Sequence, residues 1–138
     1  MFYRTIVCLL FIPLWLATSV FADDGYRESK VMFKTSNTVV GEPISYPSGT
    51  AQLTAMQIIL APGEKTDWHK HGTPLFAYML QGELMVDYGD HGKKVYRKGD
   101  SFMEAMNVKH RGMNEGESVV VILALFIGSK DQLKVIKE

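Results

Sequence analysis

Turn signals divide the chain from about residue 30 onward into short apolar segments, and this pattern constrains the fold most. Glycine turns separate these segments about every ten residues. Across residues 83–88, apolar Leu84, Val86 and Tyr88 alternate with other side chains, which is the period-2 pattern of a half-buried strand. No segment beyond residue 22 has the sustained 3.6-residue periodicity of a capped helix. The sequence therefore predicts an all-β domain, built as a sandwich or a closed barrel with few exposed sheet edges.

Several segments match strand patterns, and the longest apolar run indicates where the sheet is buried. Residues 119–127 are apolar throughout, so we expect this segment to be a strand buried on both faces. Residues 89–92 are expected to form a hairpin turn, and the charged tail, residues 129–138, is expected to form a short edge strand or a helical turn. The remaining expected strands are Lys30–Thr35, Ala51–Leu60, Leu75–Leu80, Leu84–Tyr88, Val95–Tyr96 and Ser101–Ala105.

Residues 1–22 have the pattern of a secretory signal peptide. Arg4 gives a positive start, residues 5–16 are uncharged and mostly apolar, and Val20 and Ala22 suit a cleavage site before Asp23. We therefore expect a cleaved signal peptide over 1–22, a flexible lead-in over 23–29, one domain over 30–138, and a periplasmic or secreted location. The alternative is an uncleaved membrane anchor, because residues 5–22 approach the shortest length that spans a bilayer.

The expected mature chain excludes some function classes. Removing residues 1–22 takes away one of the 15 basic residues and none of the 15 acidic residues, which leaves a net charge of −1. We therefore expect no nucleic-acid partner. The single cysteine, Cys8, lies in the signal segment, so thiolate ligands and cysteine nucleophiles are excluded from the mature domain. Histidine nitrogens and carboxylate oxygens remain as metal ligands.

Three of the four histidines form a pattern typical of a metal site. His69 and His71 are separated by one residue, so in an extended segment both side chains point to the same face. Neutral imidazole binds Zn, Cu, Fe or Ni, and His110 from a distant strand would supply a third nitrogen. The fourth histidine, His91, falls in the predicted hairpin turn and is expected to be solvated.

The glycines and histidines also fall into two regularly spaced blocks. In the first, a glycine precedes a His-x-His pair by six residues and another glycine follows the pair; in the second, glycine, histidine and asparagine occur in that order. Together they resemble the two signature motifs of the cupin superfamily, G-x5-H-x-H-x3-E-x6-G and G-x5-P-x-G-x2-H-x3-N. The residues in register are Gly63, His69, His71, Gly82, Gly99, His110 and Asn114.

The resemblance implies a single-domain cupin jelly-roll barrel that holds one divalent transition metal, either Fe, Mn, Ni, Cu or Zn. His69, His71 and His110 would be its ligands, and Asn114 would be a structural partner of the fold. Dimers are common among cupin barrels, so a homodimer through residues 30–35 is an expectation as well.

The departures from the motifs bear on function. Leu75 stands where the first motif carries its glutamate ligand, so the site is either a three-histidine site, as in some cupin dioxygenases, or uses another oxygen ligand. In the second motif, Ala105 and Asn107 replace the proline and the glycine. Asparagine tolerates positive φ, so we expect the turn to survive.

Glu104 is the candidate for the missing carboxylate. It is the only acid within the apolar stretch that leads toward His110, and a buried carboxylate needs a partner. A divalent metal would be such a partner, which makes Glu104 a candidate fourth ligand. Alternatively, it faces solvent or hydrogen-bonds loop amides and a ligating imidazole from outside the ligand shell. Glu104 and Tyr78 are also the first candidates for a catalytic acid or base.

The sequence thus predicts an exported metal-binding cupin that is a metalloenzyme of oxygenase or isomerase/lyase type. Its substrate would be a small polar molecule at the open side of the metal. The alternative is a non-catalytic cupin that binds or senses a metal or a small ligand, and a third reading is a dimer that the metal merely stabilises. No stable membrane anchor is expected.

Overall fold

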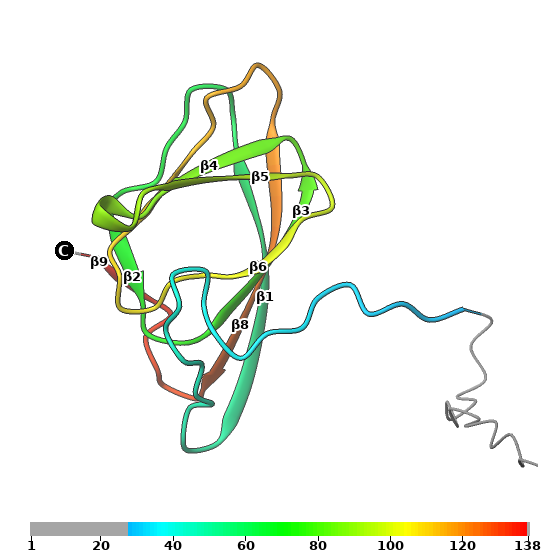
Figure 1. Ribbon diagram of the computed structural model, residues 1–138. Coiled ribbons are helices and arrows are strands. Elements are labelled where there is room, and N and C mark those ends of the chain that lie inside the picture. The colour runs from blue at the N-terminus through cyan, green and yellow to red at the C-terminus, as the bar shows by residue number, and fades with distance from the viewer. Residues whose placement is uncertain (1–27, 138) are drawn as a thin grey trace, which may run out of the picture. The chain divides into compact units, whose positions relative to one another are not determined.

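A computed structural model describes residues 28–137 of the chain, and those from Val31 on form one compact unit (Figure 1). The predicted signal peptide over 1–22 and most of the lead-in over 23–29 lie outside the described residues. Within residues 28–137, no helix has the length and apolar character needed to cross a membrane.

Strands make up nearly all of the regular secondary structure of the described residues. A single short 3₁₀ helix, η1 (Gly89–His91), lies at the predicted hairpin turn. The strands of residues 28–137 are β1 (Ala51–Leu60), β2 (His69–His71), β3 (Leu75–Gln81), β4 (Glu83–Asp87), β5 (Lys93–Arg97), β6 (Ser101–Met103), β7 (Arg111–Met113), β8 (Val120–Ser129) and β9 (Val135–Lys137).

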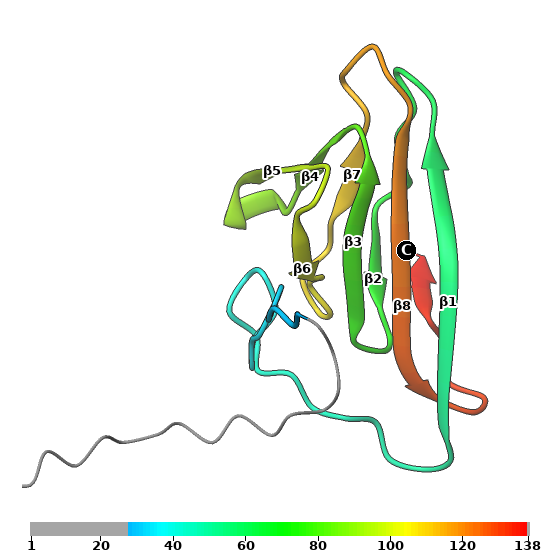
Figure 2. The ribbon, with the colours of Figure 1, turned by 90° about the vertical axis from the view of Figure 1, so that its right-hand side faces the viewer.

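The strands form two larger sheets with the hydrophobic core between them (Figure 2). The four-stranded sheet has the order β1-β8-β3-β6, the three-stranded sheet has the order β5-β4-β7, and β2 pairs with β9. All pairings are antiparallel. Single bridges from Lys65 to Met113 and from His69 to His110 link the segment that contains β2 to the segment that contains β7. The described strands therefore form the all-β fold that we expected, and the closure of its sheets into a jelly-roll barrel stays a prediction.

Alternation along β3 and β8 decides which side chains enter the core. Leu75, Ala77 and Met79 of β3 are buried, whereas the residues between them are less so. On β8 the same alternation buries Val120, Ile122, Ala124 and Phe126. The prediction that residues 119–127 are buried on both faces is therefore wrong: Leu123 keeps 37% of its surface exposed on the outer face.

One further expectation about strands differs from the structure. Residues 30–35 form no strand, because among the described residues this segment pairs with no neighbour, and Val31 and Met32 are exposed. The dimer expected through this segment stays a prediction, without the strand on which it was based. The charged tail forms the edge strand β9, which is one of the two forms that we expected for it. Strand β7, which we did not predict, pairs with β4.

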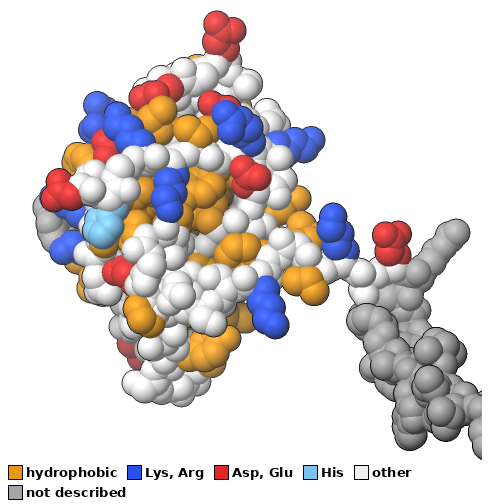
Figure 3. All heavy atoms as spheres, viewed as in Figure 1, with side chains coloured by type: hydrophobic (Ala, Val, Ile, Leu, Met, Phe, Trp, Pro, Cys, Tyr) orange, Lys and Arg blue, Asp and Glu red, His pale blue; other side chains and the backbone are white. Residues whose placement is uncertain are grey.

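Gly82 shows why a motif glycine is needed between β3 and β4. Its φ is +78°, a conformation that L side chains rarely adopt. A Cβ atom there would also lie 2.7 Å from the carbonyl oxygen of Val119. The tight turn passes the chain from β3 of the four-stranded sheet to β4 of the three-stranded sheet. On the face seen in Figure 3, hydrophobic side chains gather in the middle, between scattered basic and acidic ones.

Candidate metal centre

Backbone pairing places the three histidines together. His69 and His110 form an antiparallel bridge in which each amide donates to the other's carbonyl oxygen over 3.0 Å. His71 lies on the same face of β2 as His69, and its amide donates to the carbonyl oxygen of Met106 over 3.1 Å. The two segments that carry the histidines are therefore held by main-chain hydrogen bonds, independently of any metal.

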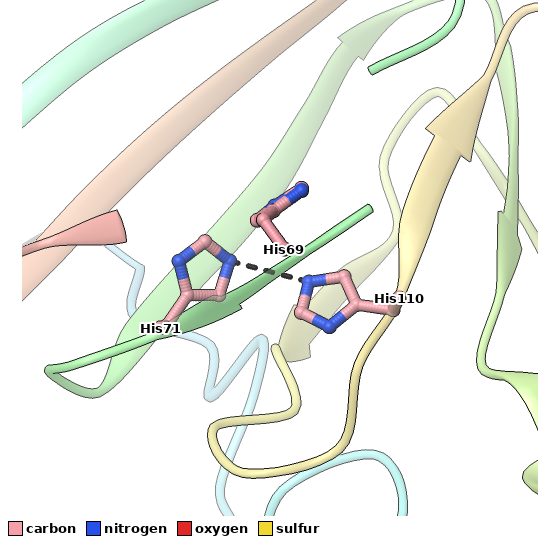
Figure 4. Close-up of side chains that lie close together, drawn as sticks. All are labelled: His69, His71 and His110. Atoms are coloured by element: carbon pink, nitrogen blue, oxygen red, sulfur yellow. Dashed lines mark hydrogen bonds between the residues drawn. The ribbon is translucent and has the colours of Figure 1, made fainter. Parts of the chain in front are cut away.

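The three imidazole rings face one another (Figure 4). Their ring centroids are 4.6 Å apart for His69 and His110, and 5.0 Å apart for each of the other two pairs. One nitrogen from each ring lies within 4.8 Å of the others. His71 and His110 are buried, whereas His69 is half-buried. The structure thus brings together the three side chains that the sequence singled out.

Each ring is oriented by a backbone carbonyl on the side away from the cluster. The Nδ1 atom of His69 lies 2.8 Å from the carbonyl oxygen of Asp67, and that of His110 lies 2.9 Å from the oxygen of Val108. The Nδ1 atom of His71 lies 3.3 Å from the oxygen of Lys134. A carbonyl oxygen only accepts, so each Nδ1 must carry the ring proton. The Nε2 atoms are therefore left with free lone pairs.

Burial keeps these rings neutral. It lowers the pKa of His69 and of His110, and it lowers the pKa of His71 to about 3. The Nε2 atoms of His71 and His110 are 3.3 Å apart (dashed in Figure 4). With both protons on Nδ1, this contact joins two lone pairs, which repel each other. A cation among the three Nε2 atoms would convert this repulsion into coordination, so the donor set fits a divalent metal.

Glu104 lies beside this cluster, just after β6. Its side chain is buried, and Oε2 is 3.9 Å from Nε2 of His110. Because His110 is neutral, this contact is not an ion pair. Burial raises the pKa of Glu104 to about 7, against the opposing effect of hydrogen bonds from the Tyr88 hydroxyl and the Ala105 amide. Among the described residues, the group with ligand atoms close to one another comprises the three histidines without Glu104.

Tyr88 and Tyr96 form a polar contact that the sequence did not suggest. The Tyr88 hydroxyl donates to the Glu104 side chain and lies 3.2 Å from the Tyr96 hydroxyl. Both tyrosines are buried, and burial raises the pKa of each. The alternation of residues 84–88 did predict that Tyr88 faces inward, but not which polar group it meets.

A small cavity of about 70 Å³ lies in front of the cluster and is lined mainly by apolar side chains, among them Leu75, Ala77 and Phe102. The three histidines and Glu104 supply its polar groups apart from Thr66. A wider outer cleft of about 390 Å³ shares His69 and His71 with it. A molecule in the cleft can therefore reach His69 and His71. The inner cavity limits the size of the part of the molecule that can enter it.

The other candidate residues lie elsewhere. Tyr78 is on the opposite face of β3 from Leu75 and Ala77 and is not among the residues that line the cavity, so its catalytic role stays a prediction. His91 is exposed on η1. Asn114 is buried, and its Nδ2 donates to the carbonyl oxygens of Leu60 and Ser118 over 3.0 and 2.9 Å. Its contacts are those of a structural residue.

Glu42 holds the loop in which the second motif departs from its pattern. Its carboxylate accepts hydrogen bonds from the amides of Met106 and Asn107, over 2.8 and 2.9 Å. Asn107 does not use the positive φ that asparagine tolerates, since Asp131 is the only non-glycine residue with positive φ among the described residues. Glu42 could not be identified from the sequence, because no local signal links it to a loop more than 60 residues away.

Residues 56–126, just over half of the chain, match the model of the cupin domain family. The chain belongs to this family. A 3-hydroxyanthranilate 3,4-dioxygenase from the yeast Meyerozyma guilliermondii is 28% identical to this cupin over 71 residues, which is 49% of this chain and 42% of that protein. The cupin therefore spans less than half the length of this relative.

Solved structures share the fold at lower identity. The polyketide cyclase RemF from Streptomyces resistomycificus is 14% identical with a TM-score of 0.55, over 64% of this chain and 61% of that chain. Oxalate decarboxylase from Lactobacillus farciminis, in a formate complex, is 19% identical with a TM-score of 0.54, over 62% of this chain and 26% of that chain. These similarities concern the fold alone.

Proposed function

We propose that this cupin is a metal-dependent enzyme that acts on a small polar molecule. The observation that carries the proposal is the set of three neutral imidazoles whose Nδ1 atoms are all committed to backbone carbonyls and whose Nε2 atoms face one another. Such a set offers three lone pairs to one cation and leaves further coordination positions open. Fe, Ni, Cu and Zn suit these imidazole ligands, and Mn is the fifth candidate metal that the cupin resemblance implies.

A bound metal would supply Lewis acidity or a redox centre. His69, His71 and His110 would hold it, and the cavity walls would exclude bulk water. Glu104 is the group that can accept or donate a proton at Oε2, because its pKa of about 7 lies near neutral pH. Tyr78 takes no part in the proposed site.

An oxygen-dependent reaction is the first reaction type to test, with isomerase or lyase chemistry next. The support for this order is the similarity to a dioxygenase, and the absence of a carboxylate at position 75, which leaves three neutral ligands. The inner cavity of about 70 Å³ accepts only a few non-hydrogen atoms of a substrate, so its reacting end must be small.

Metal analysis tests the proposal. Residues 23–138 should bind one equivalent of at least one of Fe, Mn, Ni, Cu and Zn after reconstitution. His110→Ala should abolish this binding, whereas His91→Ala, which removes an exposed histidine, should leave it unchanged. Oxygen uptake with a panel of small polar molecules then separates catalysis from binding. Failure to bind any of these metals would overturn the proposal.

We also propose that the chain is exported to the periplasm or secreted. The support is the charge and apolar pattern of residues 1–22, with Val20 and Ala22 before Asp23. Mass spectrometry of protein recovered from cells should find a mature N-terminus at Asp23. Intact protein that retains Met1 and stays in the membrane fraction would favour the uncleaved anchor instead.

A further inference from the structure

Three buried polar side chains lie next to one another, and two of them, Glu104 and Tyr88, lie beside His110. Glu104 follows β6, Tyr88 follows β4, and Tyr96 belongs to β5. Their exposed fractions are 6%, 1% and 8%. Three polar groups from separate segments meet in the core, where each unsatisfied hydrogen bond is costly. The three side chains therefore satisfy one another in a buried hydrogen-bond network.

The order of donors in this network follows from its chemistry. A carboxylate is the strongest acceptor present, so the single proton of the Tyr88 hydroxyl is donated to Glu104. The Tyr88 oxygen is then free to accept the proton of Tyr96, whose hydroxyl is 3.2 Å away. The amide of Ala105 donates to Oε1 of Glu104 over 2.8 Å. Glu104 is thus held by two donors.

Packing fixes the two tyrosines. The Tyr96 ring stacks on Phe102 with centroids 3.7 Å apart and an interplanar angle of 15°. The Tyr88 ring lies 5.6 Å from the His110 ring, and the amide of Tyr88 donates to the carbonyl oxygen of Gly92 over 2.9 Å. Neither ring can turn away without disrupting the core, so the hydroxyl of Tyr88 is a fixed anchor for the carboxylate.

We propose that Tyr88 is a positioning residue, which holds the Glu104 carboxylate beside the three histidines and keeps it out of the metal-ligand set. This inference rests on the proposed function. Oε2 of Glu104 lies 3.9 Å from Nε2 of His110, whereas Nε2 of His71 lies 3.3 Å from the same atom. A small side-chain rotation would bring the carboxylate among the ligands, and the hydrogen bond from Tyr88 opposes that rotation.

The test uses Co²⁺ as a spectroscopic probe in residues 23–138, with azide as the ligand for its open positions. In Tyr88→Phe the freed carboxylate should join the ligand set, so the visible Co²⁺ absorption should weaken as the coordination number rises. Azide affinity should fall about tenfold, a size typical for removing a partner outside the ligand shell. The double variant Tyr88→Phe/Glu104→Gln should recover the absorption and azide affinity of the unmodified protein.

Two further variants complete the design. Tyr96→Phe removes the hydroxyl that contacts Tyr88 and should lower the Co²⁺ absorption and the azide affinity by less than Tyr88→Phe does. It replaces Tyr88→Phe as the test if that variant does not fold. Tyr78→Phe removes a hydroxyl from the outer face of β3 and should change nothing. Co²⁺ binding with identical spectra in Tyr88→Phe and the unmodified protein would overturn this inference alone, whereas loss of Co²⁺ binding by the unmodified protein would overturn the proposed function too.

Discussion

The backbone amide of Glu104 donates a 2.9 Å hydrogen bond to the carbonyl oxygen of Leu75. Leu75 occupies the position of the glutamate in the first cupin motif, and its side chain is buried in the cavity wall. β3 has no carboxylate at position 75, but Glu104, just after β6, lies next to this position and lines the same cavity. A carboxyl group is present near the histidines, but it arrives from a different segment and lies beside the three nitrogens.

Restoring the motif glutamate at position 75 should make the stability of the protein depend on bound metal. Leu75→Glu places an unpaired carboxylate in the cavity wall, so we expect the metal-free variant to lose about 3 kcal/mol of unfolding free energy. Zn²⁺ should recover much of this loss, because the new carboxylate can ligate it. Leu75→Gln is the matched neutral control and should gain less from Zn²⁺. Thermal melts with and without Zn²⁺ measure the difference; equal gains for both variants would contradict the prediction.

Glu104 should destabilise the metal-free protein as pH rises. Its pKa is about 7 in the folded protein and near 4.5 when unfolded, so the folded state holds more protons between these values. Its contribution to stability is present below pH 4.5 and declines as pH approaches 7. Glu104→Gln removes this decline. The unfolding free energy of the variant relative to the unmodified protein, measured in urea, should therefore increase between pH 4.5 and 7 and then level off.

The buried histidines should have the opposite effect at acidic pH. Unfolded His71 binds a proton near pH 6.5, whereas the folded protein resists protonation until about pH 3. The metal-free protein should lose up to about 1.4 kcal/mol per pH unit for each such histidine as pH falls through this range. His71→Gln should show a shallower loss in urea titrations. The same slope in His71→Gln and in the exposed-site control His91→Gln would refute this assignment.

Glu42 should stabilise the loop that precedes His110. Burial acts to raise its pKa, but the hydrogen bonds from Met106 and Asn107 outweigh burial and lower the pKa below 4.5. Its contribution is therefore present above pH 4.5 and is lost as pH falls through the lowered value. Glu42→Gln should cost about 2 kcal/mol at pH 7, the scale of hydrogen bonds to a charged group. Glu115→Gln, at an exposed loop position, is the control in chemical denaturation.

The period-2 alternation of apolar residues predicted much of the fold, and the spacing of the motif residues predicted that the three histidines lie together. The alternation over 83–88 identified β4 and the inward side of Tyr88, and the expected strand over 51–60 coincides with β1. The His-x-His pair could be placed on one face because alternation in a strand is a local property. Its partner His110 followed from motif spacing, which encodes the pairing of two distant segments.

The sequence could not identify interactions that depend on three-dimensional neighbours. Glu42 and the loop at 106–107 lie far apart in the chain, and the Tyr88 to Glu104 hydrogen bond joins residues that follow two different strands, β4 and β6. β7 has only three residues and no alternation to detect. Tyr78 was considered for its chemistry alone, although the buried positions of Ala77 and Met79 assign it to the other face.

The pairing of β2 with β9 has a consequence for the order in which the site is completed. His71 receives its Nδ1 acceptor from Lys134, 63 residues later in the chain, and β2 receives its sheet partner from residues 135–137. During synthesis, His71 is therefore made long before the segment that orients it. A metal ion that reached the nascent chain before β9 had formed would encounter a His71 imidazole that is free to rotate. Correct metal binding must therefore wait until β9 has paired with β2.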